Sequence, residues 1–89
     1  MSRDEILERL QALVSERAGR ARTPADAGPD TPLGEGGYWL DSVDILELVV
    51  ACEHEFSISF EGEADLTEES LGTVATLADL IASKRRSVA

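Results

Sequence analysis

The central part of this 89-residue chain lacks positive charge. Between Thr23 and Ser83 there are 14 acidic residues and no lysine or arginine, and the whole chain has a formal net charge of −10. Such a field repels nucleic acid and anionic membranes, and it attracts proteins that carry basic patches. The composition therefore argues against nucleic acid and membranes as partners. Acidic surfaces also keep small proteins soluble, so the charge alone does not identify a function.

Cysteine and long apolar runs are scarce as well. The single cysteine, Cys52, excludes a disulfide within the chain and favours a reducing cytoplasmic location. No apolar run approaches the roughly 20 residues that a membrane-spanning helix needs. The length predicts a single domain over residues 1–89, with one modest core and little room for a deep catalytic cleft.

Hydrophobic periodicity predicts an all-α fold with three main helices and one short helix. The first helix is expected over about residues 3–18, where Ser2 and Glu5 have capping-box spacing. The second is expected over residues 42–56, with Asp41 as its N-cap. Its apolar residues cover an arc of roughly 220°, which predicts contact with at least two other helices. These residues are Val43, Ile45, Leu46, Leu48, Val49, Val50, Cys52 and Phe56.

The remaining segments complete a four-helix bundle with a long first loop. Residues 19–40 are rich in proline and glycine and are expected to form this loop. At this length the loop must be held in place or have a function. Residues 67–71 are expected to form the short helix, and Thr73 is expected to cap a last helix over residues 74–86. The expected anchors of the loop are Leu33, Tyr38, Trp39 and Leu40.

Ser42 is the main candidate for a functional residue. It lies at the predicted start of the second helix, between Asp41 and the apolar Val43. A serine in this position commonly serves only as a helix cap. The helix N-terminus also offers unpaired N–H groups and a partial positive charge that suit a phosphodiester. The position therefore fits either a cap or the attachment point of a phosphate-linked group.

The segment from Leu40 to Phe56 resembles the signature of acyl carrier proteins. In that family, the serine of an Asp-Ser-Leu/Ile/Met motif carries 4′-phosphopantetheine, whose thiol holds acyl chains as thioesters. The resemblance implies a non-catalytic carrier that a phosphopantetheinyl transferase modifies at Ser42. Asp41 would help to position that enzyme and its metal-bound coenzyme A. The matching residues are Leu40-Asp41-Ser42-Val43-Asp44, Glu47-Leu48-Val49, Glu53-His54-Glu55-Phe56, Thr73-Val74 and the apolar positions of the first helix.

The resemblance also implies a surface that partner enzymes recognise. Val43 stands where the family usually has a larger Leu, Ile or Met that contacts partners. Asp44, Glu47 and Glu55 share the polar arc of the second helix and match the acidic recognition face of carrier proteins. An acyl-loading enzyme, a ketosynthase or other synthase components are expected to bind this face through basic patches. The carrier itself is expected to be a monomer.

The loop before Ser42 departs from the common family pattern, because Tyr38 and Trp39 follow a pair of glycines. We expect both rings to seal the core; the alternative is that one of them touches the prosthetic arm or a partner. The departure favours a discrete carrier of a specialised pathway, such as polyketide synthesis, over a carrier of primary fatty acid synthesis. A peptidyl carrier and a cofactor-free acidic helical interaction module remain the alternatives.

The other potentially reactive residues give little evidence of a catalytic or metal site. Cys52 lies on the apolar arc and is expected to be a buried, inert thiol. His54 lies on the acidic polar arc without a nucleophile beside it. No group of residues has the spacing of a metal site or of a catalytic set. The sequence therefore predicts neither a metal centre nor an enzyme.

Overall fold

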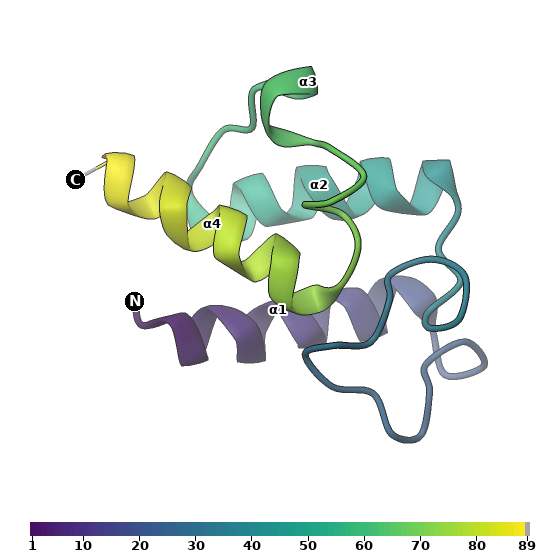
Figure 1. The fold of residues 1–89 in the computed structure, drawn as a ribbon. Helices are drawn as coiled ribbons and strands as arrows, with labels where there is room; N and C mark the ends of the chain where they lie inside the picture. Colours follow the sequence, from purple (N-terminus) through teal and green to yellow (C-terminus); the bar gives the residue numbers. More distant parts are fainter. Residues whose placement is uncertain (89) are drawn as a thin grey trace.

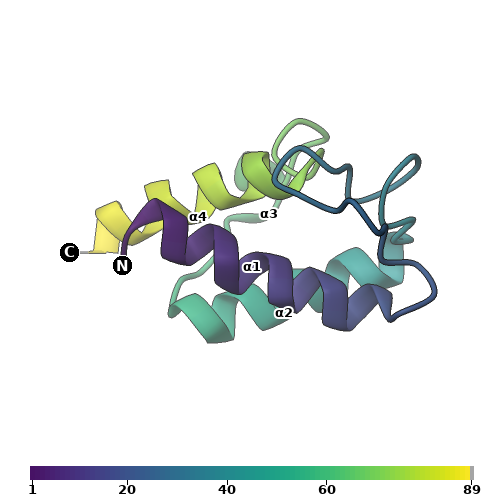
Figure 2. The ribbon, with the colours of Figure 1, turned by 90° about the horizontal axis from the view of Figure 1, so that it is seen from below.

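The computed structural model describes residues 1–88, which form four helices (Figure 1). Helix α1 spans Arg3–Ala18, α2 spans Ser42–Phe56, α3 spans Gly62–Asp65 and α4 spans Val74–Val88. Helices α1 and α2 run in opposite directions, and α1 packs against both α2 and α4 (Figure 2). The only β-pairing in this range is an isolated bridge between Pro32 and Thr73. The predicted all-α bundle with a long first loop is confirmed.

Side-chain caps fix where the main helices begin. Ser2 and Glu5 form the predicted capping box at α1, in which the Ser2 hydroxyl accepts a hydrogen bond from the Glu5 N–H. Thr73 caps α4 as predicted, because its hydroxyl accepts a hydrogen bond from the Thr76 N–H at 3.1 Å. Each cap satisfies a backbone donor that has no partner inside the helix, which typically stabilises a helix by about 1 kcal/mol.

The core lies between α1, α2 and α4, with residues of the long loop closing one end. None of the helices within residues 1–88 has the length and apolar content that a membrane crossing requires. The most deeply buried side chains come from each of these parts: Ile6, Leu10, Val14, Leu33, Tyr38, Leu48, Cys52, Phe56, Val74, Leu77 and Ile81.

The predicted burial of the wide apolar arc of α2 is only partly correct. Leu48, Val49, Cys52 and Phe56 are buried, and Ile45 is half-buried against the core. The other part of the arc is exposed, because α2 packs mainly on α1 and no other helix within residues 1–88 covers its outer side. This exposed part consists of Val43, Leu46 and Val50, with exposed fractions of 61%, 64% and 59%.

The short helix lies earlier than predicted. Residues 67–71 form a single turn instead of a helix, and α3 occupies Gly62–Asp65. The Thr67 N–H donates to the Ser70 hydroxyl and the Ser70 N–H donates to the Thr67 hydroxyl, which is a capping-box pattern that starts a turn. The turn closes with a bond from the Leu71 N–H to the Thr67 carbonyl at 3.0 Å and cannot extend, because Thr73 already caps α4 two residues later. The last helix ends at residue 88, two residues later than expected.

Backbone hydrogen bonds hold the long loop against the start of α4. The Leu33 N–H donates to the Gly72 carbonyl at 3.0 Å, and the Ala75 N–H donates to the Pro29 carbonyl at 2.8 Å. A second set of bonds folds the loop onto itself before it enters α2, including one from the Leu40 N–H to the Leu33 carbonyl at 3.0 Å. The loop is therefore fixed on both sides, and it delivers the chain to Asp41 in a defined direction.

Candidate attachment site at the start of α2

Asp41, not Ser42, caps α2. Its carboxylate accepts a hydrogen bond from the Asp44 N–H at 2.8 Å, and the Asp44 carboxylate accepts one from the Asp41 N–H at 3.2 Å. Ser42 is exposed, and within residues 1–88 its hydroxyl takes part in no hydrogen bond. The interpretation of Ser42 as a simple cap is therefore wrong, since the neighbouring carboxylate already performs that role. The Ser42 hydroxyl is left open to solvent and to other proteins.

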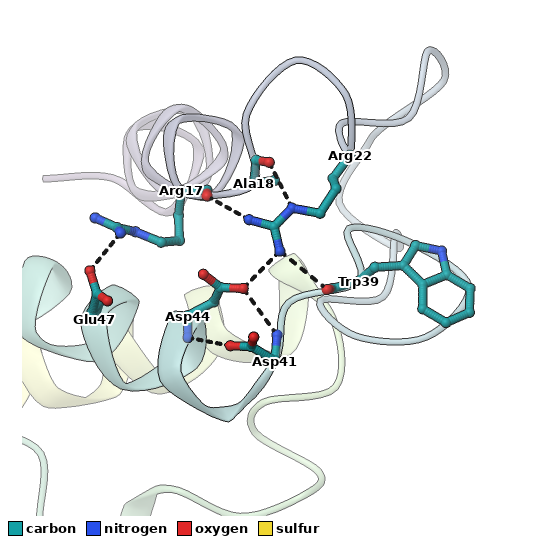
Figure 3. Close-up of polar contacts among 7 residues, drawn as sticks. All are labelled: Arg17, Ala18, Arg22, Trp39, Asp41, Asp44 and Glu47. Atoms are coloured by element: carbon teal, nitrogen blue, oxygen red, sulfur yellow. Dashed lines mark hydrogen bonds and ion pairs between the residues drawn. The ribbon is translucent and has the colours of Figure 1, made fainter.

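Arg22 ties the end of α1 to the start of α2 (Figure 3). Its guanidinium donates to the Ala18 carbonyl at 2.8 Å and to the Arg17 carbonyl at 3.0 Å, both of which belong to the last turn of α1. The same group donates to the Asp44 carboxylate at 2.7 Å and to the Trp39 carbonyl at 3.4 Å. One side chain thus holds two helix ends and the residues that lead to Ser42 in a fixed arrangement.

The contacts around Asp44 favour its charged form. The hydrogen bond from Arg22, together with the one from the Asp41 N–H, lowers the pKa of Asp44 below its ordinary value. The same pairing raises the pKa of Arg22. Both groups therefore stay ionised at neutral pH, and the capping box remains intact.

Each of the three acids predicted to recognise partners is already paired within the chain. Besides the Arg22–Asp44 pair, Arg17 lies 2.6 Å from the Glu47 carboxylate and Arg9 lies 3.1 Å from the Glu55 carboxylate. Figure 3 shows two of these pairs side by side along the junction of α1 and α2. The acidic side of α2 is therefore lined by arginines from α1 and from the turn that follows it.

The two aromatic residues before Ser42 have opposite environments. Tyr38 is buried at 1% exposure, which confirms that it seals the core. Trp39 is 58% exposed, so the same prediction for Trp39 is wrong. The backbone of Trp39 has a φ of 55°, a left-handed conformation that residues other than glycine rarely adopt. Two contacts hold it there: the Trp39 N–H donates to the Gly34 carbonyl, and the Trp39 carbonyl accepts from Arg22.

Two of the arginine pairs could have been predicted from the spacing of charged residues in the sequence, although the apolar periodicity of each helix alone does not reveal them. Arg9 and Arg17 are eight residues apart in α1, and Glu47 and Glu55 are eight residues apart in α2. In two antiparallel helices, equal spacings of opposite charge place both pairs in register. Arg22 carries no such signal, because its role depends on how the loop turns after α1.

Cys52 and His54 have the environments that the sequence predicts. Cys52 is fully buried, and burial together with the charges of Glu53 and Glu55 raises the pKa of its thiol to about 12. His54 is exposed. Within residues 1–88, no cluster of three or more histidine, cysteine or acidic residues could hold a metal ion.

Comparison with known proteins identifies the kind of protein that has this site. Residues 8–81 match the family described as the phosphopantetheine attachment site. The chain is 31% identical to the acyl carrier protein of Cyanidioschyzon merolae, over 99% of this chain and 90% of the relative. It is 31% identical to that of Guillardia theta, over 94% and 96%, and 32% identical to that of Thermosynechococcus vestitus, over 94% and 96%. No solved structure gives a significant match.

The chain therefore belongs to the acyl carrier protein family. Its cofactor is covalently attached 4′-phosphopantetheine. The enzymes that act on it are, in general terms, a phosphopantetheinyl transferase and components of a biosynthetic synthase.

Proposed function

We propose that Ser42 carries the 4′-phosphopantetheine group and that Asp41 assists the transferase that attaches it. The observation that supports this assignment best is the division of roles between the two residues. Asp41 caps the helix, and the Ser42 hydroxyl stays exposed and without a hydrogen bond in the described part of the chain. The first turn of α2 also offers N–H groups and the positive end of the helix dipole to the phosphodiester.

The protein in this proposal is a carrier without catalytic activity of its own. The attached group supplies a terminal thiol on which acyl chains are held as thioesters. The chain contributes the rigid start of α2, which presents that group at the surface, and Arg22, which fixes the approach to it. We further propose that the carrier is a monomer, that it works in the cytoplasm, and that an acyl-loading enzyme and a ketosynthase are among its partners.

Intact-mass measurement tests the attachment site. The apo protein is incubated with coenzyme A and a broad-specificity phosphopantetheinyl transferase and is then weighed. We expect a single phosphopantetheine increment for the wild type and for Ser59→Ala, which alters an exposed serine outside α2. We expect none for Ser42→Ala. An unmodified wild type with a folded circular dichroism spectrum would support the cofactor-free interaction module, and an increment in Ser42→Ala would place the attachment elsewhere.

A specialised pathway, such as polyketide synthesis, is a second part of the proposal. The exposed indole of Trp39, which lies on a left-handed backbone just before the attachment site, supports a specialised pathway. A ring in that position could contact a partner enzyme, whereas carriers with a shorter loop before the serine have no such ring. Loaded carrier should then be used faster by a polyketide ketosynthase than by a fatty acid ketosynthase. Equal or reversed preference would favour primary fatty acid synthesis. Loading with an aminoacyl group by an adenylation enzyme would favour a peptidyl carrier.

A further inference from the structure

The three pairs between arginines and the acids of α2 change what the helix shows to a partner. The carboxylates of Asp44, Glu47 and Glu55 lie 2.7, 2.6 and 3.1 Å from guanidinium nitrogens. At such separations the opposite charges act on a distant protein as small dipoles, and salt screens what remains within about 8 Å at physiological ionic strength. The acidic side of α2 therefore contributes little field beyond its own surface.

A basic residue of a partner would have to replace an arginine that is already in place. Exposed ion pairs contribute little net free energy, because both charges are well solvated when apart. Exchanging one exposed pair for another therefore gains almost nothing. The acids of α2 remain able to accept hydrogen bonds, but they are poorly suited to select a basic partner.

Beside these pairs lies an apolar strip that no other part of residues 1–88 covers. Val43, Leu46 and Val50 follow each other at helical spacing along one side of α2, and Trp39 lies at the entrance to the helix. They account for four of the five large hydrophobic residues that are exposed on residues 1–88, the fifth being Met1. Large exposed apolar groups gathered in one place commonly mark an interaction surface.

We propose that Arg9, Arg17 and Arg22 neutralise the acidic side of α2, so that partner enzymes recognise the apolar strip of Val43, Leu46 and Val50. The matching partner surface is an apolar socket without an excess of lysine or arginine. This inference rests on the proposed function, because it places the strip next to the group on Ser42. It replaces the expected recognition through basic patches at Asp44, Glu47 and Glu55.

Asp41 and Glu53 of the α2 region form no ion pair within the described residues, but a larger group of unpaired acids lies away from this helix. Glu61, Glu63, Glu68 and Glu69 are exposed, and none of them takes part in an ion pair within the described residues. They lie in α3 or in the segments that flank it; Figure 1 shows α3 on the other side of α2 from α1, with the chain then passing back to α4. A cationic probe that senses charge alone should therefore find this segment rather than α2.

The first test uses that difference and does not depend on Ser42. ¹⁵N-labelled protein is titrated at low salt with a hexalysine peptide while amide chemical shifts are recorded. We expect the shifts to change around residues 61–69 and to stay unchanged at Glu47. Arg17→Gln should bring Glu47 into the responding set. Arg3→Gln should not, although it removes one positive charge and one ion pair as well, at Asp79. A response of Glu47 in the wild type equal to that of residues 61–69 overturns the proposal.

The second test measures recognition by an enzyme. The kcat/KM of a broad-specificity phosphopantetheinyl transferase is measured at several salt concentrations. Arg17→Gln and Arg3→Gln both take the net charge from −10 to −11. We expect Arg17→Gln alone to steepen the salt dependence and to raise kcat/KM at low salt about threefold for an enzyme with basic residues around its site. Equal effects of the two variants would refute the neutralising role of Arg17.

The apolar strip is tested in the same assay. Leu46→Gln should lower kcat/KM by about tenfold at every salt concentration, because the lost contact is apolar and is not screened. Ala12→Gln, which places the same side chain on an exposed position of α1, should leave it within about twofold of the wild type. An unchanged kcat/KM for Leu46→Gln overturns the assignment of the strip. Failure of the wild type to be modified refutes the attachment proposal instead, and the hexalysine titration still decides on the arginines.

Discussion

The adjacent aromatic residues Tyr38 and Trp39 should differ widely in how much each contributes to the free energy of unfolding. Trp39 is 58% exposed, so only about two-fifths of an area of roughly 250 Å² is covered, or ~100 Å². At about 25 cal/mol per Å², removing that contact costs at most about 2.5 kcal/mol. The left-handed backbone of Trp39 costs about 1–2 kcal/mol, part of which asparagine recovers. Trp39→Asn should therefore destabilise the fold by only about 1 kcal/mol.

Tyr38 supplies the contrast, because its ring is buried at 1% exposure. Tyr38→Ala should cost about 3–5 kcal/mol, the usual range for removing an aromatic ring from a core. Urea unfolding followed by far-ultraviolet circular dichroism measures both variants without relying on tryptophan fluorescence. A Trp39→Asn variant as unstable as Tyr38→Ala would show that the indole packs far more tightly than its exposure indicates, and the reasoning would fail.

Three further predictions concern the backbone, an ion pair and the thiol. A methyl group on Gly37 would overlap the Pro32 carbonyl, so Gly37→Ala should lower the unfolding free energy by about 1–3 kcal/mol, whereas Gly28→Ala, which meets no atom, should change it little. The hydrogen bond from Arg22 lowers the pKa of Asp44 in the folded protein. The ionised Asp44 carboxylate therefore stabilises the fold fully above its unfolded pKa of about 4, and this stabilisation disappears as the pH falls through the folded pKa. Urea unfolding should therefore show the gap between wild type and Asp44→Asn narrowing from about pH 6 to about pH 3, and a constant gap would contradict this. Burial raises the pKa of Cys52 to about 12, so mass spectrometry should find iodoacetamide adducts only after unfolding.

The regular helices could be predicted from the sequence because each begins at a local signal. The Ser2–Glu5 box, the Asp41 cap and the Thr73 cap all depend on residues within three positions of one another. The short helix was placed wrongly because the start signal at Thr67 and Ser70 is followed within a few residues by the Thr73 cap of α4, which leaves room for a single turn. Local signals therefore sufficed wherever local bonds decide the structure.

The candidate site could be predicted only in part, for a different reason. Hydrophobic periodicity places Val43, Leu46 and Val50 on the same arc as the core residues, and it does not say which part of the arc another helix covers. The arginine pairs join residues far apart in the chain, and Arg22 acts through a loop whose path no periodic pattern determines. Exposure and pairing are tertiary properties, and these decide how the surface around Ser42 is recognised.

The contacts of Arg22 also imply that parts of the molecule differ in their stability against local unfolding. With its neighbours it joins α1 and α2 along one edge, so these two helices should move as a single body. Helix α3 has no buried residue, and its one ion pair is the contact of Asp65 with Lys84 at 2.9 Å. Local opening of a protein occurs where few buried contacts resist it. Amide hydrogens of residues 57–73 should therefore exchange with solvent long before those of α1 and α2. Local opening would then move the segment around α3 while the junction of α1 and α2 stays closed.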